Sequence, residues 1–398
     1  SIYNPQLILN TLSKAVSFLE AQKKISIESM KNIKINPENF NFECDLSLKA
    51  KEKVSLMSNY IYDDQGNRKA VNKVNLKCND LTISGNEGVE LRAADIDAKN
   101  VEIISSNGDI TDDSMSLDYW VEKKSKLKYV IHESATSNIN SQESISMKAK
   151  NIDLTGTNIS TGKNLQLNAE NIEFKPSYIE SSFKGVSGRK KYDGYSKIVK
   201  PQKINVNGNI EFNAKNVNLF STNIFALNSI KNNVNGNFNI SAAYDHIYAH
   251  SFYKKRRLFG SCSREQTEIT DNVRPAQIVA KEIQSLGVGT VKIESAIIKT
   301  INMHITKDLI ETSLDNKYES HDVIKRRGFF APRVRGDPLK ESLKALKRSV
   351  GGDIFPQTIG LASSVIHTCN HIKTLANLAS LPNPTMQLAS VLLSRFTT

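Results

Sequence analysis

Residues 145–154 read ISMKAKNIDL, residues 165–174 read LQLNAENIEF and residues 210–219 read IEFNAKNVNL. All three follow one frame: two apolar residues two positions apart, an alanine and, after a gap, two more apolar residues two positions apart. Apolar residues at every second position face the same side of a β-strand. The frame therefore predicts two short strands in each copy, with a bend at the alanine, whose small side chain fits a corner.

The short spacing between these copies predicts a solenoid. Ala149 and Ala169 stand 20 residues apart, which is within the range of repeats that stack along an axis. One copy cannot bury two apolar pairs alone, whereas stacked copies form a continuous core and pair each strand with the coils above and below. A β-sandwich is the competing all-β interpretation. It predicts strands spaced by hairpins with no constant corner residue, so the recurring alanine argues against it.

The turns between copies carry Asn, Asp or Gly, as in Asn207-Gly208-Asn209 and Asn235-Gly236-Asn237. These residues tolerate left-handed backbone angles. We expect Asn side chains at equivalent turns to stack in ladders along the axis. Weaker copies of the frame also occur. They are Leu46-x-Leu48-x-Ala50, Val89-x-Leu91-x-Ala93-x-x-Ile96, Phe238-x-Ile240-x-Ala242 and Val291-x-Ile293.

Basic and aromatic segments interrupt the frame near residues 110–136, 176–203 and 250–276. The last of them contains the stretch SFYKKRRLFGSCS at residues 251–263. Insertions in solenoids form loops on one face, which is often the binding face. We expect extended hairpins or partly ordered flaps in these places.

A coil followed by a basic aromatic excursion, in that order and more than once, resembles the haemagglutinin-repeat regions of two-partner-secreted exoproteins. These include filamentous haemagglutinin-like adhesins and contact-dependent growth inhibition effectors, and the likeness is nearest to their second repeat region. It rests on residues 208–219 and 251–263 and covers roughly residues 25–305. Irregular coils before Ser137 and variable excursion lengths depart from the family's pattern.

The resemblance implies an all-β fold, a right-handed parallel β-helix with hairpin or loop excursions, in a fragment of a large exoprotein at the bacterial cell surface. It implies export through an outer-membrane transporter that recognises a secretion domain, which we expect to lie outside this chain. The partner it implies is the surface or membrane of a target cell. In growth-inhibition effectors the region helps to deliver a C-terminal toxin, so a delivery module is the alternative function.

The two ends of the chain differ from the repeats. Residues 1–24 read as an irregular or helical lead-in without a signal-peptide pattern, and residues 306–337 read as a linker. Residues 338–398 read as a small α-helical segment, because Leu339, Leu343 and Leu346 recur at helical spacing. This segment is either a cap on the open end of the solenoid or a membrane-contact segment.

A formal net charge of +12 and a pI near 9.3 favour contact with anionic lipid or polysaccharide, although lysines also serve solubility. We expect no specific nucleic-acid partner. Lys325-Arg326-Arg327 is a further basic run, and any such run could equally be a solvated flap. The candidate residues for binding a polyanion or membrane are Lys254, Lys255, Arg256, Arg257, Arg189, Lys190 and Lys191, with Phe252, Tyr253 and Phe259 as apolar neighbours.

Two other motifs carry weaker predictions. Arg335-Gly336-Asp337 is an integrin-type tripeptide, but such tripeptides arise by chance and Pro338 restricts the backbone of Asp337. The four cysteines lack a metal-binding CxxC spacing. His367 and His371 would share a helical face from which Cys369 points away. We therefore predict no metal site and no cofactor.

Three classes of function fit the sequence: a surface adhesin or effector stalk, a delivery module that binds membrane or polyanion, and an enzyme on a β-helix. A polysaccharide-active enzyme needs clustered acids and cations that remove a proton and stabilise an anion. The acids Asp153, Glu173 and Glu211 read as outward-facing and scattered. We therefore predict no catalytic residue and favour the stalk.

Overall fold

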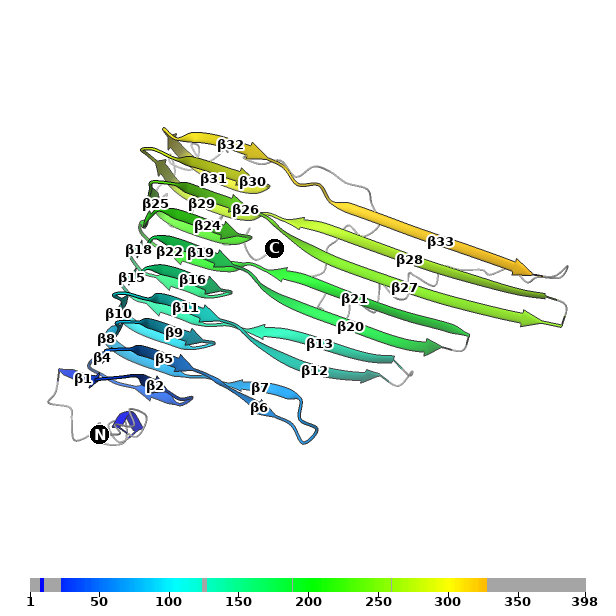
Figure 1. Ribbon diagram of the computed structural model, residues 1–398, viewed down its shortest axis with the longest axis horizontal. Coiled ribbons are helices and arrows are strands. Elements are labelled where there is room, and N and C mark those ends of the chain that lie inside the picture. The colour runs from blue at the N-terminus through cyan, green and yellow to red at the C-terminus, as the bar shows by residue number, and fades with distance from the viewer. Residues whose placement is uncertain (1–7, 11–22, 124–126, 188, 259, 328–398) are drawn as a thin grey trace, which may run out of the picture.

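The computed structural model describes residues 8–10, 23–123, 127–187, 189–258 and 260–327 and is a parallel β-helix (Figure 1). Two parallel sheets form its walls, which we call sheet A and sheet B. The strands of sheet A are β1 (Lys24–Ser29), β3 (Asn39–Asn41), β4 (Asp45–Ala50), β8 (Asn75–Gly85), β10 (Asp95–Ser105), β14 (Asn138–Ser141), β15 (Ile145–Lys148), β17 (Asn158–Thr161), β18 (Leu165–Asn168), β22 (Gln202–Val206), β23 (Ile210–Ala214), β25 (Thr222–Val234), β29 (Ala276–Ser285) and β31 (Ala296–Ile305). Those of sheet B are β2 (Ile33–Ile35), β5 (Lys53–Met57), β9 (Gly88–Arg92), β11 (Asp109–Asp113), β16 (Asn151–Thr155), β19 (Asn171–Lys175), β24 (Asn216–Phe220), β26 (Asn237–Ser241), β30 (Thr290–Glu294) and β32 (Asp308–Thr312).

Each clean copy of the repeat frame forms two strands of one coil, as the sequence predicted. Ile145 pairs in parallel with Leu165 in sheet A, and Ile152 pairs with Ile172 in sheet B. These four side chains are buried in one continuous core, and Ala149 packs against that core at the corner between the two sheets. A third strand per coil, such as β14, lacks the frame and lies in sheet A. The all-β parallel β-helix is therefore confirmed.

Asparagine ladders run along the axis in the strands as well as at a predicted turn, where the Nδ2 of Asn209 donates to Oδ1 of Asn164 at 3.2 Å. The Nδ2 of Asn171 donates to Oδ1 of Asn151 at 2.8 Å, and the Nδ2 of Asn216 donates to Oδ1 of Asn171 at 2.9 Å. A second ladder joins Asn213 to Asn168 at 2.9 Å. Because each amide bonds to the coil before it, the ladders lock neighbouring coils in register.

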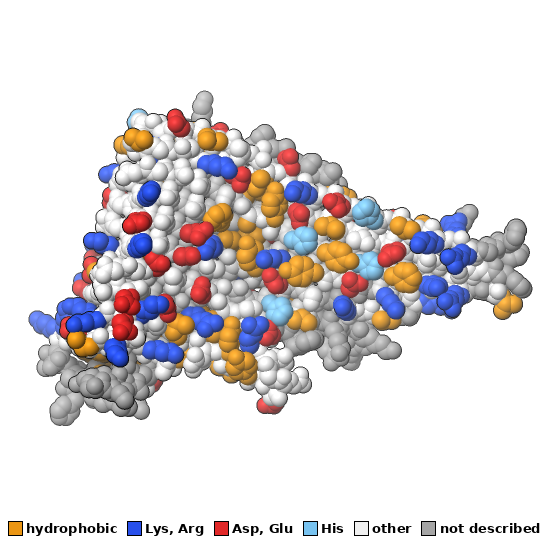
Figure 2. Space-filling view, viewed as in Figure 1, with side chains coloured by type: hydrophobic (Ala, Val, Ile, Leu, Met, Phe, Trp, Pro, Cys, Tyr) orange, Lys and Arg blue, Asp and Glu red, His pale blue; other side chains and the backbone are white. Residues whose placement is uncertain are grey.

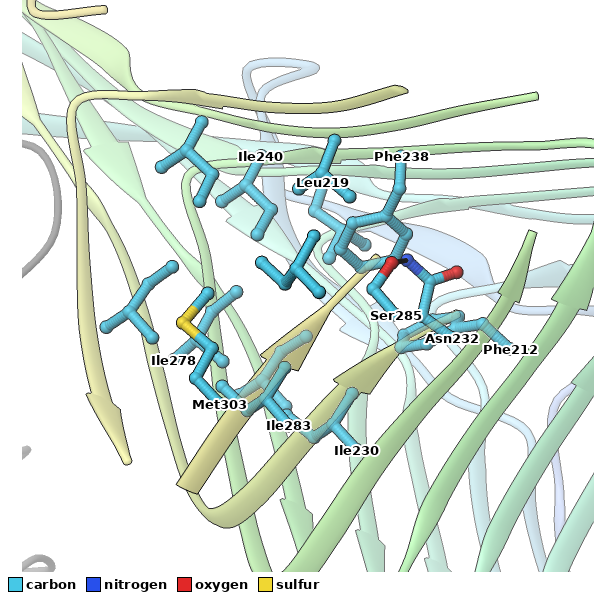
Figure 3. A pocket seen from close by; sticks show the side chains of 15 residues that line it. Phe212, Leu219, Ile230, Asn232, Phe238, Ile240, Ile278, Ile283, Ser285 and Met303 are labelled. Atoms are coloured by element: carbon cyan, nitrogen blue, oxygen red, sulfur yellow. Dashed lines mark hydrogen bonds between the residues drawn. The ribbon is translucent and has the colours of Figure 1, made fainter. Parts of the chain in front are cut away.

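A polar pair lies in the core near the last coils of the solenoid. Asn232 occupies an inward position beside Phe212, and its Nδ2 donates to the Ser285 Oγ at 2.9 Å (Figure 3). The two residues border an apolar void of about 20 Å³. A void of that size has room for about one water molecule. It is too small for an organic ligand, so the interior of the solenoid offers no binding site there.

Alternate coils turn from sheet B to sheet A in two different ways. In one kind, a single residue with positive φ makes the corner: Ala93 (φ 47°), Gly156 (φ 67°), Ser221 (φ 40°) or Ser295 (φ 49°). In the other kind, the chain leaves the solenoid at this corner as an antiparallel hairpin. The hairpins are β6–β7 (Asn59–Tyr62, Arg68–Asn72), β12–β13 (Met115–Lys123, Leu127–Ala135), β20–β21 (Ser177–Ser187, Lys190–Lys200) and β27–β28 (Ala243–Arg257, Gly260–Arg274). Strand β33 (Lys317–Arg327) leaves at the next such place.

From β12 onward the excursions form one antiparallel sheet, which we call the hairpin sheet, whereas β6–β7 forms a two-stranded sheet of its own. The strand order of the hairpin sheet is β12-β13-β20-β21-β27-β28-β33, so each hairpin pairs with the next one. The hairpins lengthen along the chain, with 9, 11 and 15 residues in β12, β20 and β27. The sheet therefore projects sideways from the solenoid and widens into a triangle (Figure 1).

Several boundaries differ from the sequence prediction. The last hairpin begins at Ala243 rather than near residue 250, because the alternating run from Tyr244 to Tyr248 mimics a coil strand. The expected linker 306–337 contains strands β32 and β33, which the frame missed because they are largely polar and exposed. Strand β1 begins at Lys24, at the end of the expected lead-in. The expected helical segment 338–398 lies outside the described residues.

Candidate functional site

The hairpin sheet has one buried face and one open face. Residues paired across antiparallel strands point to the same side. The buried side carries Ile179, Ile198, Ile247 and Ala249. It also carries Asp245, whose Oδ2 accepts a hydrogen bond from Arg274 Nε at 2.5 Å and whose Oδ1 accepts one from Val199 N at 2.7 Å. Burial raises the pKa of Asp245 to about 6, against the opposing effect of Arg274.

The open face carries a row of paired ionisable side chains where it adjoins the solenoid. The first pair is His132 Nδ1 with Asp118 Oδ1 at 2.7 Å, and Arg68 Nε bonds the other oxygen of Asp118 at 2.7 Å. Arg68 holds the pKa of Asp118 at about 2. Lys197 lies 3.6 Å from Glu180 in the same row. The pairs His132–Asp118 and Lys197–Glu180 each join the two strands of one hairpin, whereas Arg68–Asp118 ties β6–β7 to β12.

A second row on the open face contains His250. Its Nδ1 lies 2.8 Å from Asp193 Oδ1 on β21, and its Nε2 lies 3.1 Å from Glu265 Oε1 on β28. Burial opposes the charged imidazolium, but the hydrogen bonds to both acids outweigh burial and raise the pKa of His250. The histidine therefore links three neighbouring strands.

The basic runs meet at the distal end of this sheet. Lys190 pairs with Tyr253 and Lys191 with Phe252, and the Lys254 N–H donates to the Arg189 carbonyl at 3.4 Å. Two candidate segments that lie about 60 residues apart in the sequence thus occupy adjacent strands. The structure adds the run from Lys325 to Arg327, because β33 pairs with β28 at this end.

Comparisons with protein families, with curated proteins and with solved structures gave no match. The function must therefore be inferred from the geometry of the site. Among the described residues, no helix combines the length and apolar character that crossing a bilayer requires. The described part of the chain also brings together no group of three or more His, Cys, Asp or Glu side chains suited to a metal ion.

Four of the distal cations lie together on one face of the hairpin sheet. Lys254 and Lys325 both flank Ser263, and Arg256 and Arg327 both flank Ser261, so these four cations share one face. Side chains two strands apart are separated by about 10 Å, roughly one Debye length at physiological salt. No ion pair joins any of the four to another described residue, in contrast to the paired row nearer the solenoid. Their positive potentials therefore add.

Apolar side chains accompany the cations. Leu258 stands at the turn of β27–β28 and is 92% exposed, and Val186 and Val323 are also exposed nearby. Phe252 and Tyr253 are half-buried, on opposite faces of β27. Figure 2 shows Lys and Arg side chains gathered toward the far tip of the hairpin sheet, whereas the broader part of the same face mixes His, acidic and apolar groups.

Three groups of candidates remain unplaced. The Arg257 side chain, Phe259 and the tripeptide Arg335-Gly336-Asp337 lie outside the described residues. Sequence reasoning singled out Lys254 to Arg257 and Arg189 to Lys191 but left Lys325 to Arg327 off the list of candidates. Only the antiparallel pairing of β28 with β33 brings that run to the same end, and a strand register across more than fifty residues has no local sequence signal.

Proposed function

We propose that this chain is a stalk-like segment of a bacterial surface exoprotein and that the distal end of its hairpin sheet contacts the anionic surface of another cell. The observation that carries the proposal is the convergence of three basic runs, on strands β21, β27 and β33, at one unpaired cationic end. A cationic surface whose neighbouring acid, Glu265, already pairs with His250 attracts anionic polymers and lipid headgroups by long-range electrostatics. The resemblance to haemagglutinin-repeat exoproteins supports the cellular setting.

The architecture suits a stalk. The coils add length along one axis, and the corner hairpins place a second sheet at the side of that axis (Figure 1). Solenoids use repeated insertions on one face to build extended binding surfaces. Here the insertions pair with one another, so a rigid sheet rather than separate loops presents the cations.

The test is binding of the labelled chain to intact bacterial and animal cells across a salt series. The variant carries Lys254→Glu, Arg256→Glu, Lys325→Glu and Arg327→Glu. We expect it to bind at least about tenfold more weakly than the original chain, because it reverses four charges that act together. Binding of the original chain should fall as salt rises.

The matched control carries Lys148→Glu, Lys203→Glu and Lys281→Glu, three exposed lysines on the outer side of sheet A. It also lowers the net charge strongly, but it leaves the hairpin sheet unchanged. If both variants lose binding in proportion to net charge alone, the distal end is not the contact site. Binding that neither variant nor salt alters would also refute the proposal.

A further inference from the structure

A hollow of about 420 Å³ lies where the hairpin sheet leaves the solenoid. Its size is in the range of roughly 300–1,000 Å³ of small-ligand sites. One wall comes from sheet B, with Glu173, Lys175 and Phe220, and the other from the open face of the hairpin sheet, with Ser134 and Tyr178. The hollow exists because each hairpin departs at the same corner, which leaves a re-entrant angle between two sheets.

The two charged residues that line this hollow, Glu173 and Lys175, neutralise one another. Lys175 Nζ lies 2.7 Å from Asp153 Oδ2 and 3.2 Å from Glu173 Oε2. The two acids, which the sequence shows as separate outward-facing positions, are register partners on adjacent coils. Lys175 is therefore held between two acids, and the hollow has no excess of positive charge, unlike the distal end.

The remaining groups are aromatic rings and hydroxyls. Tyr178 and Phe220 are half-buried in the hollow, and Lys197 Nζ lies 4.2 Å from the centroid of the Tyr178 ring. The hydroxyls of Ser134 and Thr155 also line it, and the Ser134 Oγ donates to the Tyr178 carbonyl at 3.1 Å. Rings offer an apolar surface, whereas carboxylates, ammonium and hydroxyls offer acceptors and donors for several hydroxyl groups at once.

We propose that this hollow binds a saccharide unit of an uncharged glycan. The C–H face of the sugar would lie against Phe220 and Tyr178, and its hydroxyls would donate to Glu173 and accept from Lys175. The site is separate from the distal cations, and it requires neither salt-sensitive attraction nor the proposed stalk function. The chain would then carry two binding surfaces with different chemistry on one face of the hairpin sheet.

The test uses four uncharged hexasaccharides, of glucose, mannose, galactose and N-acetylglucosamine, with saturation-transfer NMR and titration calorimetry on the whole chain. We expect at least one of them to bind with an affinity unchanged between low and high salt. Glu173→Gln and Phe220→Ser should each weaken that binding about tenfold or more. Both sites are partly exposed, so the variants should retain the thermal unfolding midpoint.

The matched controls are Glu211→Gln, an outward acid of sheet A, and Tyr62→Ala, an exposed ring on β6. Both should bind as the original chain does, and so should the fourfold distal variant described above. The proposal is overturned if none of the hexasaccharides binds, if the hollow variants bind as tightly as the controls, or if the distal variant removes the binding.

Discussion

At the scale of single residues, the most unusual group in the solenoid is a buried carboxylate. Asp112 lies between Leu91 and Leu154 in the sheet B register, so an acid occupies a place that leucine fills in the adjacent coils. The Ser137 Oγ donates to its Oδ1 at 2.7 Å and the Thr157 Oγ1 donates to its Oδ2 at 2.5 Å. Ser137 Oγ in turn accepts from the Ala94 N–H at 2.9 Å. The carboxylate thus anchors a corner by joining three successive coils.

Burial raises the pKa of Asp112 to about 7, and the hydrogen bonds from Thr157 and Ser137 oppose that rise only in part. The pKa of Asp112 is higher in the folded protein than in the unfolded chain. Between about pH 4 and pH 7 the folded state therefore binds a proton that the unfolded state has lost. This stabilisation is fully present below about pH 4 and is lost by about 1.4 kcal/mol per pH unit as the pH rises to 7.

Asp112→Asn keeps the shape of the side chain and removes the titration. We therefore expect the variant's thermal midpoint minus that of the original chain to increase from about pH 4 to pH 7 and to level off above pH 7. Thermal unfolding followed by circular dichroism across this pH range measures the difference between the two midpoints. The contributions of all other titrating groups cancel in that difference. A difference that stays constant with pH would contradict the assignment.

At the scale of elements, the corner residue decides whether a coil closes tightly. A single left-handed residue turns the chain from sheet B to sheet A, as at Gly156 and Ala93. At Gly156 a Cβ would approach Thr136 Cγ2 to 2.7 Å and Ser177 Cβ to 2.8 Å. The backbone conformation and the packing therefore both require glycine there, whereas the corner at Ala93 accommodates a side chain in the same conformation.

These two corners give a matched pair of substitutions. Gly156→Ala should reduce the free energy of unfolding by about 2 kcal/mol or more, through left-handed strain and the close contacts. Ala93→Gly should change it by less than about 1 kcal/mol, because relief of strain offsets the extra chain entropy of glycine. Urea unfolding followed by circular dichroism gives both values. Equal effects at the two corners would show that backbone conformation does not control the turn.

At the scale of the whole molecule, the hairpins form one cooperative sheet because each bridges the hairpins beside it. β20–β21 pairs with β13 on one side and with β27 on the other. β6–β7, in contrast, forms a two-stranded sheet of its own. The effect of deleting a hairpin on the stability of the other hairpins therefore depends on its position in this sheet rather than on the hydrogen bonds within it.

Replacing residues 176–201 by one glycine would close this coil with a corner like the one at Gly156. We expect the solenoid to stay folded, while the β27 amides lose hydrogen-exchange protection because their edge loses its partner. Replacing residues 58–73 in the same way should leave β27 protected. Exchange measured by NMR or mass spectrometry distinguishes these results. Unchanged protection of β27 after the first deletion would show that β27–β28 is stable by itself.

The sequence was sufficient for the coil but not for the way its copies join. The frame at Ile145 to Leu154 repeats cleanly, because each side chain in it faces the core or the corner. The frame aligned Val89 and Phe238 with its first strand, which in the clean copies lies in sheet A. Both residues lie in sheet B instead, and Ala93 occupies the corner opposite to that of Ala149. Alternation alone cannot distinguish two strands of equal period.

The hairpin sheet was only partly predictable for a related reason. Basic and aromatic composition marked where the chain leaves the solenoid, and Lys254 to Arg257 stood out by charge alone. The pairing of β21 with β27 and of β28 with β33 depends on coil stacking, which brings distant corners into line. The contact of Lys175 with both Glu173 and Asp153 could not be predicted from the sequence, because the same stacking of coils brings Asp153 beside the other two residues.

The sideways direction of the hairpins has a mechanical consequence. Hydrogen bonds between antiparallel strands run perpendicular to those strands. A pull on the turn at Leu258, directed away from the solenoid, acts along β27 and β28 and loads the many bonds that join them to β21 and β33 together in shear. A pull along the solenoid axis acts parallel to the bonds between coils and separates them one row at a time. A load borne at the hairpin tip is therefore shared across a whole ladder, whereas tension along the axis concentrates on one coil after another.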